Sequence, residues 1–336
     1  MRYRVDTVVA LLGPAALVIA VGIGASLVSR SNEIHFLNAL VSVAVVVAIY
    51  VFVGSSGVLS FGQISFVAVG AFAAGVLTVP LESKTGVLPD LFPILRDHTI
   101  GNPASLALAA LVGGVFAFLV GMPLMRLSGL AAGIATFAVL EITHNLLREW
   151  TKIGPGATTL SLVPETTGPL QATLGALLVI LVAFLYQLSP LGRKVRATRE
   201  DPAAAQAVGV SVHRQRLWAF TLSGALCGFA GGLLVHMLGS ITTEQVYLEL
   251  TFITLAMLVV GGLTSLWGAV VGALAVSGLD SVLGNAEDGI SVGFTVDLPE
   301  GSRLVILGAL MALMLILRPS GITGGRELRL PRRRTA

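Results

Sequence analysis

Long apolar stretches, separated by short polar connections, dominate this chain. Ten can be distinguished, at residues 8–28, 36–53, 58–79, 104–124, 129–147, 170–188, 217–238, 248–263, 266–283 and 303–317. Most of them approach the roughly 20 apolar residues that an α-helix needs to cross a bilayer. The pattern predicts an all-α, polytopic membrane protein of about ten transmembrane helices.

The eighth and ninth stretches are the least clearly separated. Gly261, Gly262 and Thr264 interrupt the apolar run between them only weakly. Two separate spans fit this pattern, and so does one broken or re-entrant element. The sequence leaves this choice open.

Composition supports the membrane assignment. The 336 residues are 55% hydrophobic and 12% charged, against roughly 25% charged residues in a typical soluble domain. A soluble chain of this length could not cover its surface with so few charges, whereas lipid-facing positions must be apolar. Arg2 and Arg4 precede the first stretch, as they would in a signal peptide. Because that stretch is long enough to span, we expect it to be retained as the first helix.

Charge asymmetry indicates the orientation. If the N-terminus lies in the cytoplasm and successive stretches alternate, 15 of the 21 Lys and Arg residues fall in cytoplasmic segments. This is the positive-inside distribution of multi-pass membrane proteins. It predicts an even number of spans with both termini in the cytoplasm. The basic residues cluster at the ends of apolar stretches and therefore do not indicate nucleic-acid binding.

Glycines recur at a regular spacing in the seventh stretch. Gly224, Gly228 and Gly232 share one helical face, and the pairs at 129/133 and 268/272 repeat the same interval. Small residues four positions apart let helix backbones approach closely in lipid. We expect all of these glycines to lie in helix–helix contacts.

The longest cytoplasmic connection, 189–215, carries signals for the start and end of a helix. Asp201 is a suitable N-cap, Pro202 suits the first helical position, and a run of alanines follows. Gly209 supplies the left-handed residue that often ends a helix. These signals predict a short, rigid helix at 202–208. A solvated loop with ordinary positive-inside charge is the alternative, although a loop does not require such defined ends.

Four segments carry a resemblance to a known family. The most specific is GRKVRATREDPAAAQAVGVSVHRQRLWAFTLSGALCGFAGGLL, which begins at Gly192. The others are GVLSFGQISFVAVGAFAAG from Gly57, LSGLAAGIATFAVLEI from Leu127 and LAMLVVGGLTSLWGAVVGA from Leu255. In this order they resemble the inner-membrane permeases of branched-chain amino acid ABC importers, in particular the M-type (LivM-like) subunit.

The resemblance implies a type II ABC importer-like permease in a prokaryotic cytoplasmic (inner) membrane. It also implies partners: a homologous H-type permease, two ABC ATPase subunits and an extracytoplasmic solute-binding protein. The ATPase subunits would use ATP and Mg, and this chain would bind no cofactor. Residues 1–320 would form the transmembrane permease domain and 321–336 a basic cytoplasmic tail. Two features depart from the family: Ala73 stands where an aromatic residue is frequent, and the tail is unusually basic.

In such importers, a cytoplasmic helix of the permease sits in a groove of the ATPase and couples the two. The resemblance assigns this role to the helix at 202–208. The expected coupling residues are Arg199, Glu200, Asp201, Pro202, Ala205 and Gly209.

A polar, glycine-rich segment opens the third apolar stretch. Such segments are tolerated at membrane depth where they line a cavity or pack against protein, so pathway lining and close helix packing both remain open. Glu141 is the main ionisable residue within a span and is a functional candidate by default. The alternative is that it reaches the outer interface or pairs with a backbone or imidazole donor, such as His144. The candidate pathway residues are Gly57, Ser60, Phe61, Gly62, Gln63, Ser65 and Glu141.

Three further residues in the spans are given structural roles. Asp280 is expected to face the lipid headgroups near the outer end of the ninth stretch. His236 is expected to be a satisfied interface residue. Cys227, the only cysteine, is expected to be buried, and it excludes an intrachain disulfide.

No catalytic or metal-binding motif occurs in the sequence. It contains no G-x-x-x-x-G-K-[ST] segment, so ATP hydrolysis would have to come from a partner. The sequence predicts a transport subunit rather than an enzyme, with branched-chain or other amino acids, urea or amides as possible substrates. A secondary transporter driven by an ion gradient would need intramembrane acids in paired repeats. A lipid-modifying enzyme would need clustered polar groups at one membrane depth, and neither pattern is evident.

Overall fold

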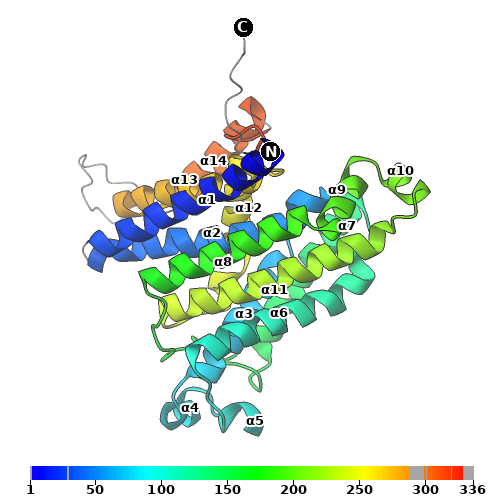
Figure 1. Ribbon diagram of the computed structural model, residues 1–336. Coiled ribbons are helices and arrows are strands. Elements are labelled where there is room, and N and C mark those ends of the chain that lie inside the picture. Colours follow the sequence, from blue (N-terminus) through cyan, green and yellow to red (C-terminus); the bar gives the residue numbers. More distant parts are fainter. Residues whose placement is uncertain (1, 29, 288–298, 300, 319, 328–336) are drawn as a thin grey trace.

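The computed structural model describes residues 2–28, 30–287, 299, 301–318 and 320–327 (Figure 1). All ten apolar stretches form helices in it, which confirms the predicted fold class. These helices are α1 (Arg2–Leu27), α2 (Arg30–Ser56), α3 (Gln63–Thr78), α6 (Asn102–Leu124), α7 (Gly129–Glu149), α8 (Pro169–Leu188), α11 (Val212–Leu238), α12 (Leu248–Gly261), α13 (Leu266–Glu287) and α14 (Ser302–Leu317).

Shorter helices occupy the connections. They are α4 (Leu81–Val87), α5 (Pro93–Arg96), α9 (Pro190–Glu200), α10 (Pro202–Ala207) and the 3-10 turn η1 (Glu244–Val246). Eight helices of the described chain are long and apolar enough to cross a membrane. The other two apolar helices are shorter: α3, and the segment Val305–Met314 within α14. The described residues therefore contain ten apolar helices, one for each predicted stretch, and two of these are below the usual spanning length.

The eighth and ninth stretches are both helical in the structure. They form two separate helices, α12 and α13, that turn back on each other after Gly261. A Cβ atom at Gly268 would lie 2.8 Å from the Gly261 carbonyl oxygen, so the two backbones are in direct contact. A side chain at either position would separate the helices.

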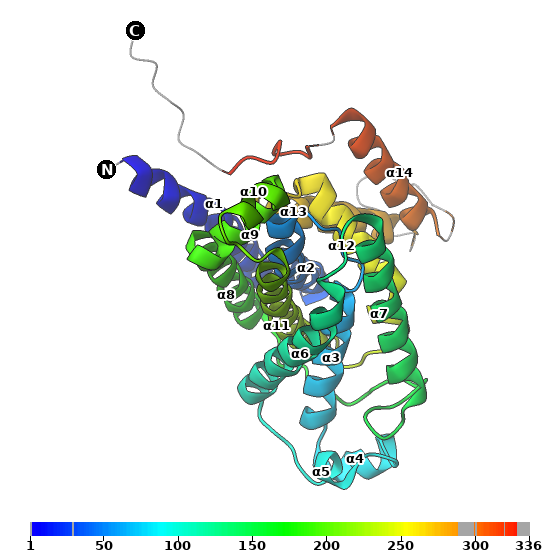
Figure 2. The ribbon, with the colours of Figure 1, turned by 90° about the vertical axis from the view of Figure 1, so that its right-hand side faces the viewer.

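The helices are arranged around α2 and α11. In the most apolar stretch of each helix, 83% of the residues of α2 and 72% of those of α11 are buried, against 22% of those of α1. The N-terminus, α9 and α10 lie at one end of the bundle, and α4 and α5 lie at the opposite end (Figure 2). We refer to these as the α9–α10 end and the α4–α5 end.

Helix α2 is buried on all sides by its neighbours. Its central residues from Val43 to Ile49 are almost completely inaccessible, and many are β-branched. Such residues have a slightly lowered helix propensity in water. Inside a bilayer the helix forms regardless, because its own backbone groups are the only available hydrogen-bond partners.

The glycines of α11 lie in close contact with α6. A Cβ atom at Gly232 would lie 2.8 Å from Leu106 Cδ2, and one at Gly228 would overlap the Ala109 carbonyl oxygen. At Gly224 a Cβ atom would overlap the side chain of Ala117. Glycine is required here because the backbones approach too closely for any side chain.

The other two glycine pairs differ from each other. Gly268 and Gly272 on α13 lie against the backbone of α12, as the spacing predicts. A Cβ atom at Gly129 would meet no atom within 4 Å, and one at Gly133 would reach only Phe61, at 3.9 Å. The prediction of close packing is wrong for this pair, because this part of α7 lies at the edge of the bundle.

The three residues given structural roles are all buried. Cys227 is buried within α11, and His236 contacts Ser105 Oγ at 2.9 Å and the Pro164 carbonyl oxygen at 3.1 Å. Asp280 is 7% exposed and has an interaction within the protein. The expectation that Asp280 faces the headgroups is therefore wrong, because its side of α13 is turned into the bundle.

Candidate functional site

The connection between α8 and α11 contains two helices, whereas the sequence signals predicted one. Helix α9 begins at Pro190 and ends at Glu200, immediately before α10. The Ser189 side chain caps it by accepting a hydrogen bond of 3.1 Å from the Gly192 backbone N–H. The pair Ser189–Pro190 was the missed signal, since it matches the cap and first position of a helix just as Asp201–Pro202 does.

The predicted ends of α10 are present in the structure. Asp201 Oδ1 accepts hydrogen bonds of 2.9 and 3.0 Å from the backbone N–H groups of Ala203 and Ala204. Gly209 has a φ angle of +82°, and the helix ends two residues earlier, at Ala207. Two capping interactions on so short an element fix its direction relative to α9.

Helix α10 presents a mostly apolar surface beyond the bundle, with Gln206 as its one polar side chain. Pro202, Ala203 and Ala204 are exposed, and Val208 is 78% exposed, while Ala205 faces inward. Exposed apolar residues at a helix tip are typical of a contact with another protein. The surface is therefore available to a partner subunit at the α9–α10 end.

Arg199, in the last turn of α9, connects this segment to the end of α2. Its Nη1 donates a hydrogen bond of 2.7 Å to the Gly54 carbonyl oxygen, and its Nη2 lies 2.5 Å from Glu200 Oε1. Its aliphatic chain lies against Gly57, where a Cβ atom would be 2.7 Å from Arg199 Cγ. Gly57 has a φ of +69°, so the glycine meets both a conformational and a steric requirement.

The predicted pathway segment forms the irregular junction between α2 and α3. Residues 57–62 lie outside the helices, although the sequence pattern placed most of them in the third apolar helix. The Phe61 N–H donates a hydrogen bond of 3.3 Å to Thr136 Oγ1, and a Cβ atom at Gly62 would lie 2.6 Å from the Thr136 carbonyl oxygen. The junction is therefore held against α7.

Three polar side chains of this junction and of the first turn of α3 are buried. Ser60, Gln63 and Ser65 are each at most 1% exposed. Within the described part of the chain, Ser60 Oγ, Gln63 Nε2 and Ser65 Oγ have no hydrogen-bond partner. Gln63 Oε1 accepts a hydrogen bond of 3.1 Å from Ser223 on α11. Buried polar atoms without partners are energetically costly and call for an explanation, such as a bound water molecule or a functional role.

The segment after α14 closes the same end of the bundle. The Ile322 N–H donates a hydrogen bond of 2.8 Å to the Val260 carbonyl oxygen at the end of α12. Glu327 Oε1 accepts one of 2.8 Å from the Leu266 N–H and thereby caps α13. Burial raises the pKa of Glu327, while its bonds to the α13 backbone, to Gln187 and its attraction to Arg196 act in the opposite direction. The first residues of the predicted tail therefore pack on the bundle, and residues 328–336 lie outside the described part.

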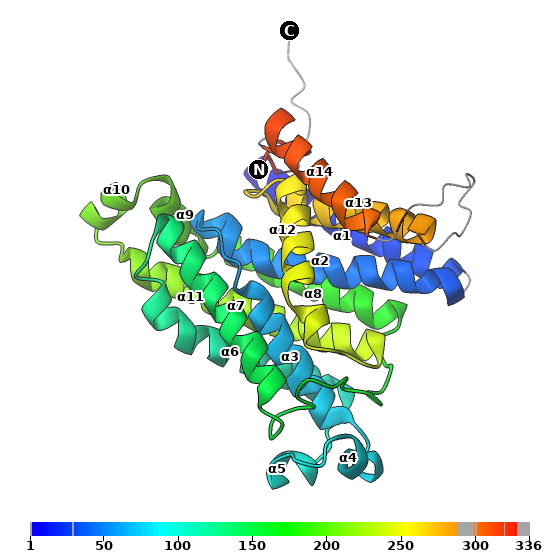
Figure 3. The same ribbon diagram turned by 180° about the vertical axis from the view of Figure 1, so that it is seen from behind.

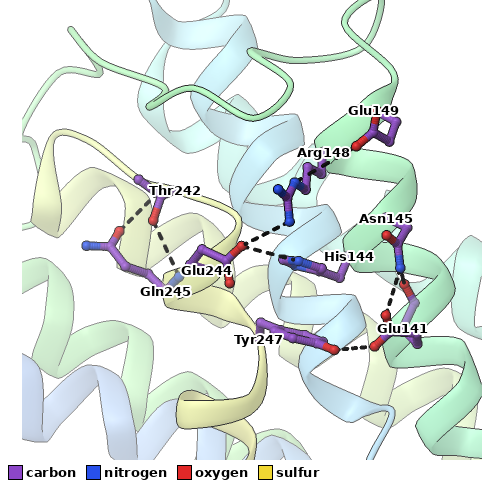
Figure 4. A network of polar contacts seen from close by, with 9 residues as sticks. All are labelled: Glu141, His144, Asn145, Arg148, Glu149, Thr242, Glu244, Gln245 and Tyr247. Carbon is purple, nitrogen blue, oxygen red and sulfur yellow. Dashed lines mark hydrogen bonds and ion pairs between the residues drawn. The ribbon is translucent and has the colours of Figure 1, made fainter.

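Glu141 belongs to a polar network between α7 and the start of α12 (Figure 4). Its carboxylate accepts hydrogen bonds from the Tyr247 hydroxyl and, at 2.8 Å, from Asn145 Nδ2. The Tyr247 ring stacks on the His144 ring with centroids 3.9 Å apart. Nearer the end of α7, Glu244 Oε1 lies 3.5 Å from His144 Nε2 and 3.7 Å from Arg148 Nη1.

The structure therefore separates the predicted site residues into three places. The coupling residues lie on or next to α9 and α10. In the junction, Gly57 lies beside Arg199, while Phe61 and Gly62 contact Thr136 of α7. Glu141 lies further along α7, away from the coupling residues. Sequence reasoning missed Tyr247, because nothing in its neighbourhood identifies it as a partner of Glu141. Across the described residues, no group of three or more His, Cys, Asp or Glu side chains could hold a metal ion.

Comparisons with known proteins identify the family of the chain. Residues 34–315 match the model of the family described as "Branched-chain amino acid transport system / permease component". The chain is 29% identical to a high-affinity branched-chain amino acid transport system permease protein, LivM, from Salmonella typhimurium, over 92% of this chain and 73% of the relative. It is 28% identical to LivM from Escherichia coli, over 81% of this chain and 65% of that relative.

A further match covers less of the chain. A probable branched-chain amino acid transport permease protein, LivH, from Methanocaldococcus jannaschii is 34% identical over 44% of this chain and 45% of its own length. No solved structure matches the chain.

Proposed function

The chain belongs to the family of permease components of branched-chain amino acid transport systems, and from this we propose that it imports branched-chain amino acids as one subunit of an ATP-driven transporter. It is a multi-pass membrane protein and a transport subunit rather than an enzyme. The observation that carries the proposal is the capped α9–α10 segment, whose Arg199 contacts the end of α2 at Gly54.

The partners that we propose are a homologous H-type permease, two ATPase subunits and an extracytoplasmic solute-binding protein. The match to a protein named LivH supports a pair of related permeases. The exposed apolar tip of α10 fits a groove of an ATPase subunit, because it offers contact area without charge. ATP and Mg would be bound by the ATPase subunits, in a prokaryotic cytoplasmic membrane with both termini of this chain in the cytoplasm.

The proposed mechanism is mechanical and involves no covalent chemistry in this chain. ATP binding draws the ATPase subunits together and moves α10, and the two caps oblige α9 to follow. Arg199 then transmits the movement to the α2–α3 junction through Gly54 and Gly57. Rearrangement of the junction would provide partners for the buried polar atoms of Ser60 and Gln63 as solute passes.

The matched family does not favour the alternatives. A urea or amide importer would share the architecture but would differ in substrate. A secondary transporter would work without ATPase subunits, and a lipid-modifying enzyme would need a cluster of reactive groups.

The experiment is uptake of labelled leucine by vesicles that contain this chain, its permease partner and both ATPase subunits, supplied with the native binding protein. Uptake should require ATP, and excess isoleucine or valine should compete. Uptake of urea or an amide, with none of leucine, would contradict the proposed substrate. Uptake that follows an ion gradient without the ATPase subunits would contradict the transporter class.

A further inference from the structure

We propose that the face between α7 and α12 is a solute-recognition site, in which Glu141 binds the ammonium group of an apolar amino acid and three phenylalanines receive its side chain. The proposal rests on the function proposed above and adds the residues that recognise the solute. Figure 3 shows this face, with α7 and α12 on either side of α3.

The apolar part of the site is an open cluster of aromatic rings. The Phe61 ring lies 6.4 Å from Phe137 on α7 and 6.5 Å from Phe252 on α12, both edge-to-face. Phe137 is 39% exposed and Phe252 is 50% exposed. Both rings therefore keep surface that other residues of this chain do not cover. Phe61 belongs to the α2–α3 junction, so the cluster adjoins the segment whose rearrangement is proposed above.

The polar part of the site is the Glu141 carboxylate, which is attracted to His144, although the salt bridge of that imidazole is with Glu244. Among the described residues, Glu141 forms no ion pair with Lys, Arg or His, and its donors Tyr247 and Asn145 are neutral. The guanidinium of Arg148, about two turns further along α7, contacts Glu244 and Glu149 instead. A carboxylate within a spanning helix is costly unless a positive group approaches it. A solute ammonium group supplies that charge and forms a charge-assisted hydrogen bond.

The Tyr247 hydroxyl is held in place by its neighbours. Stacking on His144, with the ring planes 14° apart, fixes the plane of the tyrosine. The His144 ring is in turn held by Glu244, 3.5 Å from its Nε2. Tyr247 is thus a positioning residue for the Glu141 carboxylate, and it leaves the remaining lone pairs of that carboxylate free to accept from a ligand.

The order of groups along the face matches an amphipathic solute entering from the α4–α5 end. Glu141 lies eight residues before the end of α7, which is about 12 Å along the helix axis. Phe137 lies one turn deeper. A solute would first meet the ion pair of Arg148 and Glu244. It would then meet the Glu141 carboxylate, and after that the aromatic rings. Neither a fully apolar nor a fully polar solute would use both halves of this face.

The test compares charge with shape at residue 141 in the reconstituted importer supplied with leucine-loaded binding protein. Glu141→Gln keeps the shape and hydrogen-bonding oxygen but removes the charge, whereas Glu141→Asp keeps the charge on a shorter side chain. We expect Glu141→Gln to lower the leucine imported per ATP hydrolysed by about tenfold or more. A fall of this size corresponds to the loss of one charge-assisted hydrogen bond. Glu141→Asp should retain several times more import than Glu141→Gln.

Glu249→Gln is the matched control. Glu249 lies two residues beyond Tyr247, on the same helix as Phe252, and its side chain is exposed. This substitution removes the same charge from the same region and should leave import per ATP near the wild-type value. Copurification of the ATPase subunits checks that each variant assembles. Phe252→Ala should lower import of leucine more than import of alanine, because only the larger side chain uses the rings.

The outcomes separate the two proposals. Normal import by an assembled Glu141→Gln complex, or import by Glu141→Gln equal to that of Glu141→Asp, would overturn the recognition site while leaving the importer intact. A wild-type complex that imports another ammonium-bearing solute but no leucine would overturn the proposed substrate. Glu141→Gln would then be scored on that solute by the same criterion.

Discussion

Arg199 of α9 donates a hydrogen bond of 2.7 Å to the carbonyl oxygen of Gly54 near the end of α2. The two residues are 145 positions apart in the sequence, and their contact joins the α9–α10 segment to the α2–α3 junction. Gly54 also lies against the α12–α13 connection, since a Cβ atom there would be 2.6 Å from the Leu263 carbonyl oxygen. A displacement of α9 would therefore reach α2, α3 and α12 together.

Arg199→Ala should weaken this link without preventing assembly. The substitution leaves the Gly54 carbonyl oxygen without its donor, a loss of about 1–3 kcal/mol for a hydrogen bond to a charged group. We expect uptake to fall several-fold relative to ATP hydrolysis, as measured in vesicles. Arg193→Ala is the control, because Arg193 is exposed on the same helix and the change removes the same charge. Equal uptake per ATP in the two variants would contradict the role of Arg199.

Gly228→Ala should destabilise the fold. Its Cβ atom would overlap the Ala109 carbonyl oxygen, so α6 and α11 would have to separate, at a cost of about 1–3 kcal/mol. Gly278→Ala is the control, because no atom lies within 4 Å of its Cβ position and alanine favours a helix. Thermal unfolding in detergent should show a lowered midpoint for the first variant only. A midpoint unchanged by Gly228→Ala would mean that the two helices do not pack as described.

Gly62→Leu should reduce transport while the ATPase subunits still copurify. A side chain there meets the Thr136 carbonyl oxygen at 2.6 Å and would push the α2–α3 junction away from α7. Gly133→Ala makes a control, since its Cβ would find ordinary contact with Phe61 at 3.9 Å. Leucine uptake at matched expression is the measurement. Wild-type uptake by the Gly62→Leu protein would exclude the junction from the pathway.

The two ends of the bundle should face opposite sides of the membrane. Reporters inserted after residues 126 and 200 should signal cytoplasm, and reporters after residues 95 and 158 should signal the outside. The reason is that α6, α7 and α8 each cross the bundle once between these positions, while Lys and Arg favour the α9–α10 side. Signals from the same side at 126 and 158 would mean that α7 does not span.

The sequence predicts most of the fold because helices in lipid are specified by length and hydrophobicity. All ten apolar stretches are helices, and the capping signals at Asp201 and Gly209 correspond to the observed α10. The separation of α12 from α13 could not be predicted, because it depends on the direct contact of Gly261 with Gly268 across the turn. Helix α9 was predictable from Ser189 and Pro190. It was missed because its many charged residues resemble those of a solvated cytoplasmic loop.

The sites were less predictable, since they join residues distant in the sequence. The contact between Arg199 and Gly54, and the hydrogen bond between Tyr247 and Glu141, each depend on how the helices pack. Asp280 also shows that sequence position alone does not reveal how a residue packs. Its position near a helix end suggested exposure, but the side of α13 that carries it is buried.

The central claim is that α10 transmits movement of the ATPase subunits to the spans. Asp201→Ala removes a cap worth about 1 kcal/mol, whereas Asp201→Ser retains an oxygen that can accept the same hydrogen bonds. Gly209→Val strains a backbone at φ +82°, by about 1 kcal/mol or more. No neighbour lies within 4 Å of its Cβ position, so the strain is conformational. Asparagine tolerates this region, which makes Gly209→Asn the matched control.

The most direct measurement is leucine uptake together with ATP hydrolysis in the same reconstituted vesicles for Gly209→Val and Gly209→Asn. The account predicts that Gly209→Val either loses the ATPase subunits or hydrolyses ATP without uptake, while Gly209→Asn stays near wild type. The binding protein should retain its affinity for leucine in both cases. Normal uptake per ATP by a Gly209→Val complex that retains its ATPase subunits would contradict the coupling role of α10.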